Sequence, residues 1–211
     1  WSVVEAAEFS TEPKLFCYPI TVCGAYQGYF DREDALAFAE GLESAGFETA
    51  VGPVAAYSTL GWFADPVLSS VLHYPDTHLA ELIFHELAHE LLFVPGDTTF
   101  NESFATFVGR AGVEQWLTDS GRTATLEEFR ADAALHDKTV NLIRDTRLTL
   151  GELYARSITQ VDMRLQKRMM LDELVEDYRK FRNERLVSNW DGWFKEGLNN
   201  AKLASVGSYH D

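Results

Sequence analysis

Along the first third of the chain, hydrophobic positions alternate between short strand-like runs and one helical stripe. The stripe runs from Ala35 to Leu42, after a candidate N-cap at Asp31, and predicts a helix that stops near Gly46. The short apolar runs are bounded by turn residues and predict strands. They cover residues 1–4, 15–18, 26–30, 47–51 and 54–63.

Helical periodicity takes over after residue 75. A Pro-Asp-Thr segment at residues 75–77 opens a helix with a broad apolar face, and a Pro-Gly-Asp segment at residues 95–97 ends it. A second helix is predicted at roughly residues 101–117. Because only a short turn separates the two helices, we expect the second to fold back over the first.

The rest of the chain is predicted to be long helices. Thr125 and Thr149 are each followed three residues later by a glutamate, which is the spacing of a capping box. Residues 152–185 form one long, charged helical pattern, and glycines interrupt residues 189–207. A mixed front half followed by a helical back half predicts an α+β fold.

Composition and charge narrow the choice of partners. The net charge of −15 repels the phosphates of nucleic acids and anionic membrane surfaces, so we expect no nucleic-acid partner. Hydrophobic residues make up 46% of the chain, which is enough for a sizeable core. The chain has no run of about 18 apolar residues, so no transmembrane segment is predicted in it.

A His-Glu-Leu-Ala-His motif at residues 85–89 contains candidate metal ligands and a candidate catalytic base. His85 and His89 are four residues apart on a predicted helix, so their imidazoles lie on one face and can bind one zinc ion. Glu86 is then placed to act as a base on a water molecule. A catalytic zinc needs a third protein ligand, and Glu102 on the following helix offers a suitable carboxylate. The sequence therefore predicts one Zn²⁺ held by these two histidines and Glu102.

Two other interpretations of the same residues are structural. The pentapeptide is short, so the histidines could be ordinary helix residues beside a surface glutamate. Glu102 follows three residues after Thr99 and could be the capping-box glutamate of its own helix. The metal site is favoured because unpaired imidazoles are costly in an apolar helix, and because a returning helix would bring Glu102 towards the histidines.

The zinc motif followed by Asn101-Glu102-x-x-Ala105 resembles the thermolysin-like zinc peptidases with a glutamate ligand, the gluzincins. More narrowly, residues 56–117 resemble a bacterial family described as putative aminopeptidases. The matching blocks are Ala-Tyr-Ser-Thr-Leu-Gly-Trp-Phe at 56–63 with Asp-Pro at 65–66, Leu-Ile-Phe at 82–84, Gly-Asp-Thr at 96–98, and Phe-Asn-Glu-Ser-Phe-Ala-Thr at 100–106. The similarity continues over residues 17–31 and 198–206, so it covers most of the chain.

This resemblance implies the same three ligands and the same base as the motif does. It also implies a zincin-like core, with a small mixed sheet and the active-site helix, at residues 1–120. A helical subdomain at residues 121–211 would pack on that core, unless the whole chain is one single domain. The family's proteins usually continue beyond the point that corresponds to Asp211.

The resemblance further implies a location in the bacterial cell envelope. The protein would be periplasmic, either secreted or held by a lipid anchor upstream of Trp1. From their spacing alone, Cys17 and Cys23 could be two reduced thiols or a disulfide. An envelope location favours the disulfide, because such compartments are oxidising.

The sequence departs from the resemblance at two places. Thr106 stands four residues after Glu102, where thermolysin-like enzymes have an aspartate that orients a ligand histidine. Asp97 or Thr106 is expected to take that part here. The chain also lacks the Gly-Ala-Met-Glu-Asn segment that holds the free amine of the substrate in well-studied zinc aminopeptidases. Cleavage inside a peptide and cleavage at its end therefore both stay open.

Substrate-binding residues are expected on both sides of the motif. In zinc peptidases of this type an edge strand before the zinc helix pairs with the substrate backbone. Tyr57, Ser58, Thr59 and Gly61 fit such a strand, and they fit an ordinary buried strand equally well. Tyr209 is favoured as the stabiliser of the oxyanion, because it follows the block at residues 198–206. The other candidates for that role are Tyr154, Tyr57 and His136.

The sequence thus predicts a zinc-dependent peptidase that acts on a peptide or protein substrate through an activated water, with Glu86 as general base. An aminopeptidase is one form of this function. The main alternative is a catalytically inactive zinc- and peptide-binding module of the envelope, which would keep the ligands and lack an oxyanion partner. A third hypothesis is a structural helical envelope protein with chance histidines.

Overall fold

The computed structural model describes residues 1–17, 23–54, 71–182 and 190–207. The chain forms two compact units. The sheet unit combines residues 1–53 with residues 134–208, and the helix-pair unit consists mainly of residues 54–133. The division into a catalytic core at 1–120 and a helical subdomain at 121–211 stays a prediction. None of the described helices is long and apolar enough to cross a membrane.

The sheet unit is built on three antiparallel strands in the order β2-β1-β3. Its first elements are β1 (Ser2–Ala7), β2 (Gln27–Gly28), α1 (Arg32–Ser44) and β3 (Phe47–Gly52). The predicted helix after Asp31 and the predicted strand at 47–51 are confirmed. The Asp31 side chain accepts a hydrogen bond from the Glu33 N–H, and Gly46 follows the helix with a φ of 90°, which suits glycine.

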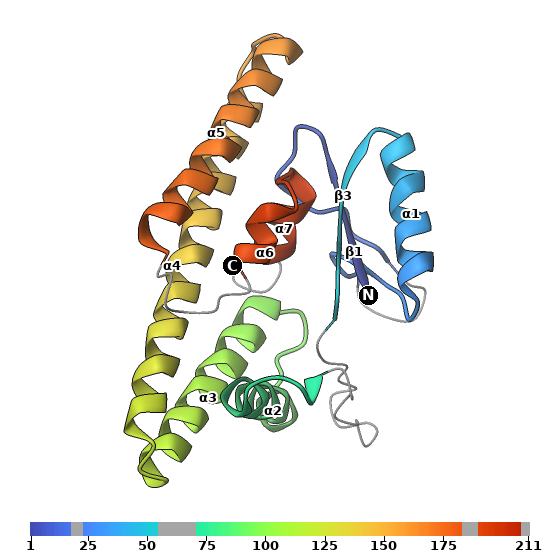
Figure 1. Cartoon of the computed structure of the whole chain (residues 1–211). Helices are drawn as coiled ribbons and strands as arrows, with labels where there is room; N and C mark the ends of the chain where they lie inside the picture. The colour runs from blue at the N-terminus through green and yellow to red at the C-terminus, as the bar shows by residue number, and fades with distance from the viewer. Residues whose placement is uncertain (18–22, 55–70, 183–189, 208–211) are drawn as a thin grey trace. The chain divides into compact units, whose positions relative to one another are not determined.

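Helices cover both faces of this small sheet. Because side chains alternate along a strand, Val3 packs on Ala35 and Ala39 of α1 while Val4 packs in the other direction. Val4 shares its cluster with Ala201 and Ala204 of α7 (Asn200–Gly207). Figure 1 shows α1 on one side of β1 and β3 and α7 on the other.

Helices supply the main core of the sheet unit. They are the long α4 (Thr123–Tyr154) and α5 (Gln160–Phe181) and the short α6 (Trp190–Lys195). The first residues of α4 belong to the helix-pair unit. The buried residues shared by these helices and α7 are Ile143, Leu150, Leu153, Met163, Leu171, Leu174, Tyr178, Phe194, Leu203 and Val206. With its small sheet and many helices, the described chain is an α+β protein that is mostly helical.

Two predictions about the helical half are wrong. Thr125 and Thr149 lie inside α4, which begins at Thr123, and the Thr149 hydroxyl donates to the Asp145 carbonyl one turn earlier. The charged pattern at residues 152–185 is not one helix, because the chain leaves α4 after Tyr154. Thr159 then caps α5 by accepting a hydrogen bond from the Asp162 N–H.

A buried polar cluster holds the start of the sheet unit to its end. Lys167 Nζ donates to the Glu8 carbonyl at 2.8 Å and also bonds the Glu48 carboxylate. Asn200 donates to the same Glu8 carbonyl at 2.8 Å, and its backbone N–H donates to Glu48 at 2.6 Å. Tyr154 completes the cluster by donating its hydroxyl to Asn200, and burial raises the pKa of that phenol. These groups satisfy one another, which marks the cluster as structural.

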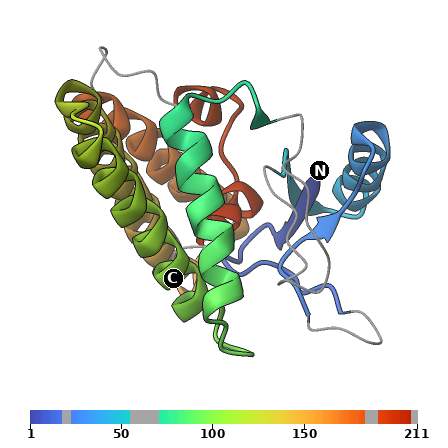
Figure 2. The same cartoon turned by 90° about the horizontal axis from the view of Figure 1, so that it is seen from below.

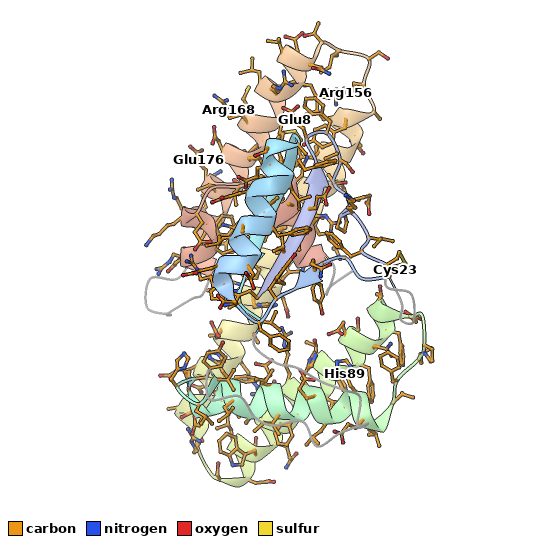
Figure 3. All side chains as sticks on the ribbon, turned by 90° about the vertical axis from the view of Figure 1, so that its right-hand side faces the viewer. Glu8, Cys23, His89, Arg156, Arg168 and Glu176 are labelled. Carbon is orange, nitrogen blue, oxygen red and sulfur yellow. A yellow bond between two sulfur atoms is a disulfide. The ribbon has the colours of Figure 1, made fainter. Side chains whose placement is uncertain are left out.

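The structure also shows how the two cysteines are paired. Cys17 and Cys23 are joined by a disulfide, and Figure 3 labels Cys23. The pairing that the resemblance implies is therefore present. It closes a small loop in the sheet unit, beside the bridge between Phe16 and Gly24.

Candidate metal centre

The His-Glu-Leu-Ala-His motif lies in α2 (Asp76–Leu91), the first helix of the helix-pair unit. The predicted helix start after Pro75 is confirmed, and Asp76 in the first turn bonds Arg122 at 2.7 Å. One turn separates His85 from His89, and their Nε2 atoms lie 3.2 Å apart. His89, labelled in Figure 3, is buried with 8% of its surface exposed, whereas His85 is half-buried.

The third donor comes from α3 (Thr98–Asp119), which runs back along α2 (Figure 2). Glu102 places Oε2 at 3.3 Å from His85 Nε2 and Oε1 at 3.6 Å from His89 Nε2. The capping-box interpretation of Glu102 is wrong. The N-cap of α3 is Asp97, which accepts a hydrogen bond from the Phe100 N–H at 2.9 Å, so Glu102 lies in the second turn, beyond the capping position.

The three donor residues lie close enough together to bind one metal ion. The two Nε2 atoms are 3.2 Å apart, Glu102 Oε2 lies 3.3 Å from His85 Nε2, and Glu102 Oε1 lies 3.6 Å from His89 Nε2. With one oxygen taken from Glu102, the three ligand atoms all lie within 4.8 Å of one another, and a small adjustment brings them to the separations of about 3.3–3.6 Å that a tetrahedral zinc requires. Within the described part of the chain, these residues are the only group of three or more His, Cys, Asp or Glu side chains that could hold a metal ion. Two imidazoles and one carboxylate are also a donor set that zinc prefers.

Close packing of α3 on α2 sets these distances. A Cβ added at Gly109 would lie 3.0 Å from the Glu81 carbonyl oxygen, and one added at Gly112 would lie 2.7 Å from the Phe84 ring. Ala105, between Glu102 and these glycines, is fully buried. Small residues on this face of α3 therefore allow the two backbones to approach closely enough for the donors to meet.

The connection between the helices is held by a polar side chain. Asn101 is only 2% exposed. Its Oδ1 accepts a hydrogen bond from the Val94 N–H at 2.8 Å, and its Nδ2 donates to the Val94 carbonyl at 2.9 Å. Asn101 belongs to the block at residues 100–106 that carries the family resemblance, but its position in the sequence predicted no role for it. Its signal is a polar side chain beside a candidate ligand in the first turns of a helix.

Charged residues tie α2 to the other two helices of this unit. His78 Nε2 lies 3.1 Å from Asp132 of α4, and this hydrogen bond raises the pKa of His78. Glu81, one turn further along α2, lies 3.6 Å from Arg110 of α3. Burial raises the pKa of Glu81, and the Arg110 charge opposes that shift.

The Glu86 carboxylate and the second ring nitrogen of His89 also suit a metal site that has a catalytic base. Glu86 is half-buried and directly follows His85 on α2. The Nδ1 atom of buried His89 has no hydrogen-bond partner among the described residues. A histidine that ligates a metal through Nε2 commonly donates from this second nitrogen. Of the two residues expected to orient a ligand histidine, Asp97 instead caps α3, and the role of Thr106, which lies one turn after Glu102 on α3, stays a prediction.

Several predicted site residues cannot be placed beside these donors. Tyr57, Ser58, Thr59, Gly61 and Tyr209 lie outside the described residues and stay predictions. The other two oxyanion candidates belong to the sheet unit: Tyr154 donates to Asn200, and the His136 ring packs against Trp190.

Comparison with known proteins adds a family to this geometry. The profile of a family described as "Putative aminopeptidase" matches residues 1–211. No curated protein and no solved structure matches the chain. The family's description is that of a peptidase, a hydrolase whose substrate is a peptide. Because the profile extends over all 211 residues, the chain belongs to the putative aminopeptidase family.

Proposed function

We propose that this protein is a zinc-dependent peptidase of the gluzincin type, with one Zn²⁺ held by His85, His89 and Glu102. The observation that supports this most strongly is the convergence of the two histidine Nε2 atoms, 3.2 Å apart, with the Glu102 carboxylate, whose two oxygens lie 3.3 and 3.6 Å from them. Membership of a family described as aminopeptidases gives the class of reaction. A zincin-like core with α2 as the active-site helix is part of the same proposal.

In the proposed mechanism, Glu86 moves the proton. A bound Zn²⁺ would lower the pKa of a water molecule and polarise the scissile carbonyl. The Glu86 carboxylate takes the proton of the attacking water and delivers it to the leaving amine. Its position next to His85 keeps it within one helical turn of both histidines. Glu102 adds negative charge that offsets part of the charge of the ion.

The substrate and the location are proposed on the same basis. A peptide or protein substrate would pair its backbone with residues 57–61, and Tyr209 would stabilise the developing oxyanion. The proposed location is the cell envelope. Fractionation of the periplasm would test it. The disulfide between Cys17 and Cys23 supports it, because disulfides persist in oxidising compartments. A lipid anchor or secretion would bring the protein there.

The test is a peptide library incubated with the zinc-loaded protein, with and without a chelator. We expect hydrolysis that the chelator abolishes and that added Zn²⁺ restores. Glu86→Gln should keep the metal and lower kcat by about 10²- to 10⁴-fold, because proton transfer is lost. Glu90→Gln, an exposed glutamate one turn further on α2, is the matched control and should keep full activity.

Three outcomes would count against the proposal. Hydrolysis that survives complete removal of metal would exclude zinc chemistry. Full turnover by Glu86→Gln would exclude Glu86 as the base. Zinc binding and peptide binding without any turnover would identify a binding module in place of an enzyme.

A further inference from the structure

Asn101 closes the connection between α2 and α3 through both atoms of its side-chain amide. The carbonyl oxygen accepts from the Val94 N–H at 2.8 Å, and the amide nitrogen donates to the Val94 carbonyl at 2.9 Å. The pair imitates the backbone pairing of two strands, and Asn101 is almost completely buried. Both polar ends of the side chain are therefore used on one residue of the connection.

Val94 lies within the connection and Asn101 lies in the first turns of α3, each near a metal donor in the sequence. Val94 is five residues after His89, and Asn101 immediately precedes Glu102. At the end of α2 the Leu92 N–H bonds the Ala88 carbonyl at 3.0 Å. The hydrogen bonds thus define the path of the chain from the last histidine ligand to the carboxylate.

Among the described residues, apolar packing holds this connection only in part. Leu92, Phe93 and Val94 are 42%, 43% and 38% exposed. The side chain that caps α3, Asp97, is itself exposed and bonds only within the first turn of α3, to the Phe100 N–H. The Asn101 amide is consequently the buried side-chain tie between the connection and α3, among the residues that the structure describes.

We propose that Asn101 is a positioning residue for the metal centre, which holds the Glu102 carboxylate at metal-binding distance from the two histidines. This inference rests on the proposed function. Its physical basis is preorganisation. The two hydrogen bonds between Asn101 and Val94, which we call the Val94 clamp, form before the metal binds. Less of the free energy of metal binding is then spent on ordering the chain around Glu102. Without the clamp, only the packing of α3 on α2 at Gly109 and Gly112 would hold Glu102 near the histidines before the metal binds.

The experiment measures Zn²⁺ affinity of the whole chain by competition with a chromogenic chelator. Asn101→Ala should raise the Kd for Zn²⁺ by about 10- to 100-fold, the range expected when a residue that orients a ligand is removed. Asn101→Asp keeps an acceptor for the Val94 N–H and loses the donor to the Val94 carbonyl, so its Kd should lie between those of wild type and Asn101→Ala. The absorption spectrum of bound Co²⁺ should change in the same order, because it reports ligand geometry.

Asp97→Ala is the matched control for a merely structural effect. It removes a hydrogen bond at the start of the same helix and leaves the Val94 clamp untouched. Its unfolding free energy, measured with a chelator present, should fall, as it does for other lost caps. Its Kd for Zn²⁺ should change by less than about threefold, since loss of a cap does not release Glu102 from the clamp.

The outcomes separate the inference from the proposed function. Equal Kd values and Co²⁺ spectra for wild type and Asn101→Ala would overturn the inference, as would equal weakening by Asp97→Ala. If Asn101→Ala does not fold, the same comparison is made with Asn101→Asp. A wild-type chain that binds no Zn²⁺ would overturn both proposals. A wild-type chain that binds Zn²⁺ without hydrolysis would overturn the proposed function alone.

Discussion

His78 and Asp132 form a pair that is an ion pair only while His78 is protonated. Their nitrogen and oxygen atoms lie 3.1 Å apart, and the pKa of His78 is raised from 6.5 by the hydrogen bond to Asp132. Glu81 from α2 raises it further. Both partners are partly exposed, at 37% and 33%, which limits the free energy that the pair contributes. The pair still joins α2 to α4 within the helix-pair unit.

Replacement of His78 by Gln should destabilise the chain in a pH-dependent way. A folded pKa above the unfolded value means that the stabilisation is complete below about pH 6.5 and is lost as pH rises through the folded pKa. We expect a difference in unfolding free energy of up to about 1 kcal/mol at pH 6, which falls towards zero as pH rises through the folded pKa of His78. Denaturant unfolding with a chelator present measures it.

The same substitution on an Asp132→Asn background is the control. With the carboxylate gone, the difference in unfolding free energy that His78→Gln causes should no longer depend on pH in this window. A pH-independent difference in the original background would show that the pair is not charged in the folded chain.

At the residue scale, spacing in the sequence was enough to select His85 and His89, whereas Glu102 also had an interpretation as a helix cap and was selected through the family resemblance. A helix turns by a fixed angle per residue, so histidines four apart share a face before any packing is known. Asn101 could not be given a role in the same way. A polar residue near the start of a helix can point to solvent or to a loop carbonyl, depending on the path of that loop. Hydrophobic periodicity does not predict that path.

The closeness of α2 and α3 is a property of whole elements. The contact depends on the absence of side chains at Gly109 and Gly112, and the neighbour of Gly109 is a backbone carbonyl that cannot rotate away. A Cβ at Gly109 would also lie 3.6 Å from the Cβ of His85. Any widening at this point moves the carboxylate donor away from both histidines.

Gly109→Ala should therefore weaken the binding of Zn²⁺ and destabilise the fold. Alanine gains up to about 1 kcal/mol in helix propensity, whereas overpacking of a close contact costs about 1–3 kcal/mol, so the net effect is a loss. The Kd for Zn²⁺ should rise together with this loss. Gly41→Ala in α1 is the control, because nothing lies within 4 Å of its Cβ, and it should stabilise the chain. An unchanged Kd for Gly109→Ala would show that the helices do not need this close approach.

At the element scale, the sequence predicted most helices but misplaced some of their ends. Periodicity identified α1, α2 and α3, because each has an apolar face and a start or stop signal. It could not rank competing threonines as caps. Thr149 and Thr159 both satisfy local rules for a cap, and packing of Leu150 and Leu153 in the core keeps the chain helical past Thr149.

The whole molecule carries a net charge of −15, and this field acts on any charged peptide that approaches it. A cationic peptide should be attracted at low salt and an acidic one repelled. We expect kcat/KM for a cationic substrate to fall as ionic strength rises from about 0.02 M to about 0.5 M, because the Debye length shortens over that range. A neutral peptide of the same length is the control. An identical salt response for cationic and neutral peptides would mean that the net charge has no part in substrate capture.

At this largest scale the sequence was least informative. The sheet unit joins residues 1–53 to residues 134–208, and its buried cluster brings Asn200 to the carbonyls of Ala7 and Glu8. Hydrophobic periodicity reports what each segment buries and carries no information about which distant segment covers it. The polar partners of Lys167 and Glu48 were unpredictable for the same reason.

The connection clamped by Asn101 also bears on the order in which the chain assembles. All three donors lie within residues 85–102, on helices joined by a short connection, so little loop entropy opposes their meeting. The sheet, in contrast, must wait for α7 near the end of the described chain. Wherever the chain folds, we expect the helix hairpin to become competent for metal capture while the sheet still lacks its covering helix. Metal loading would then precede completion of the fold.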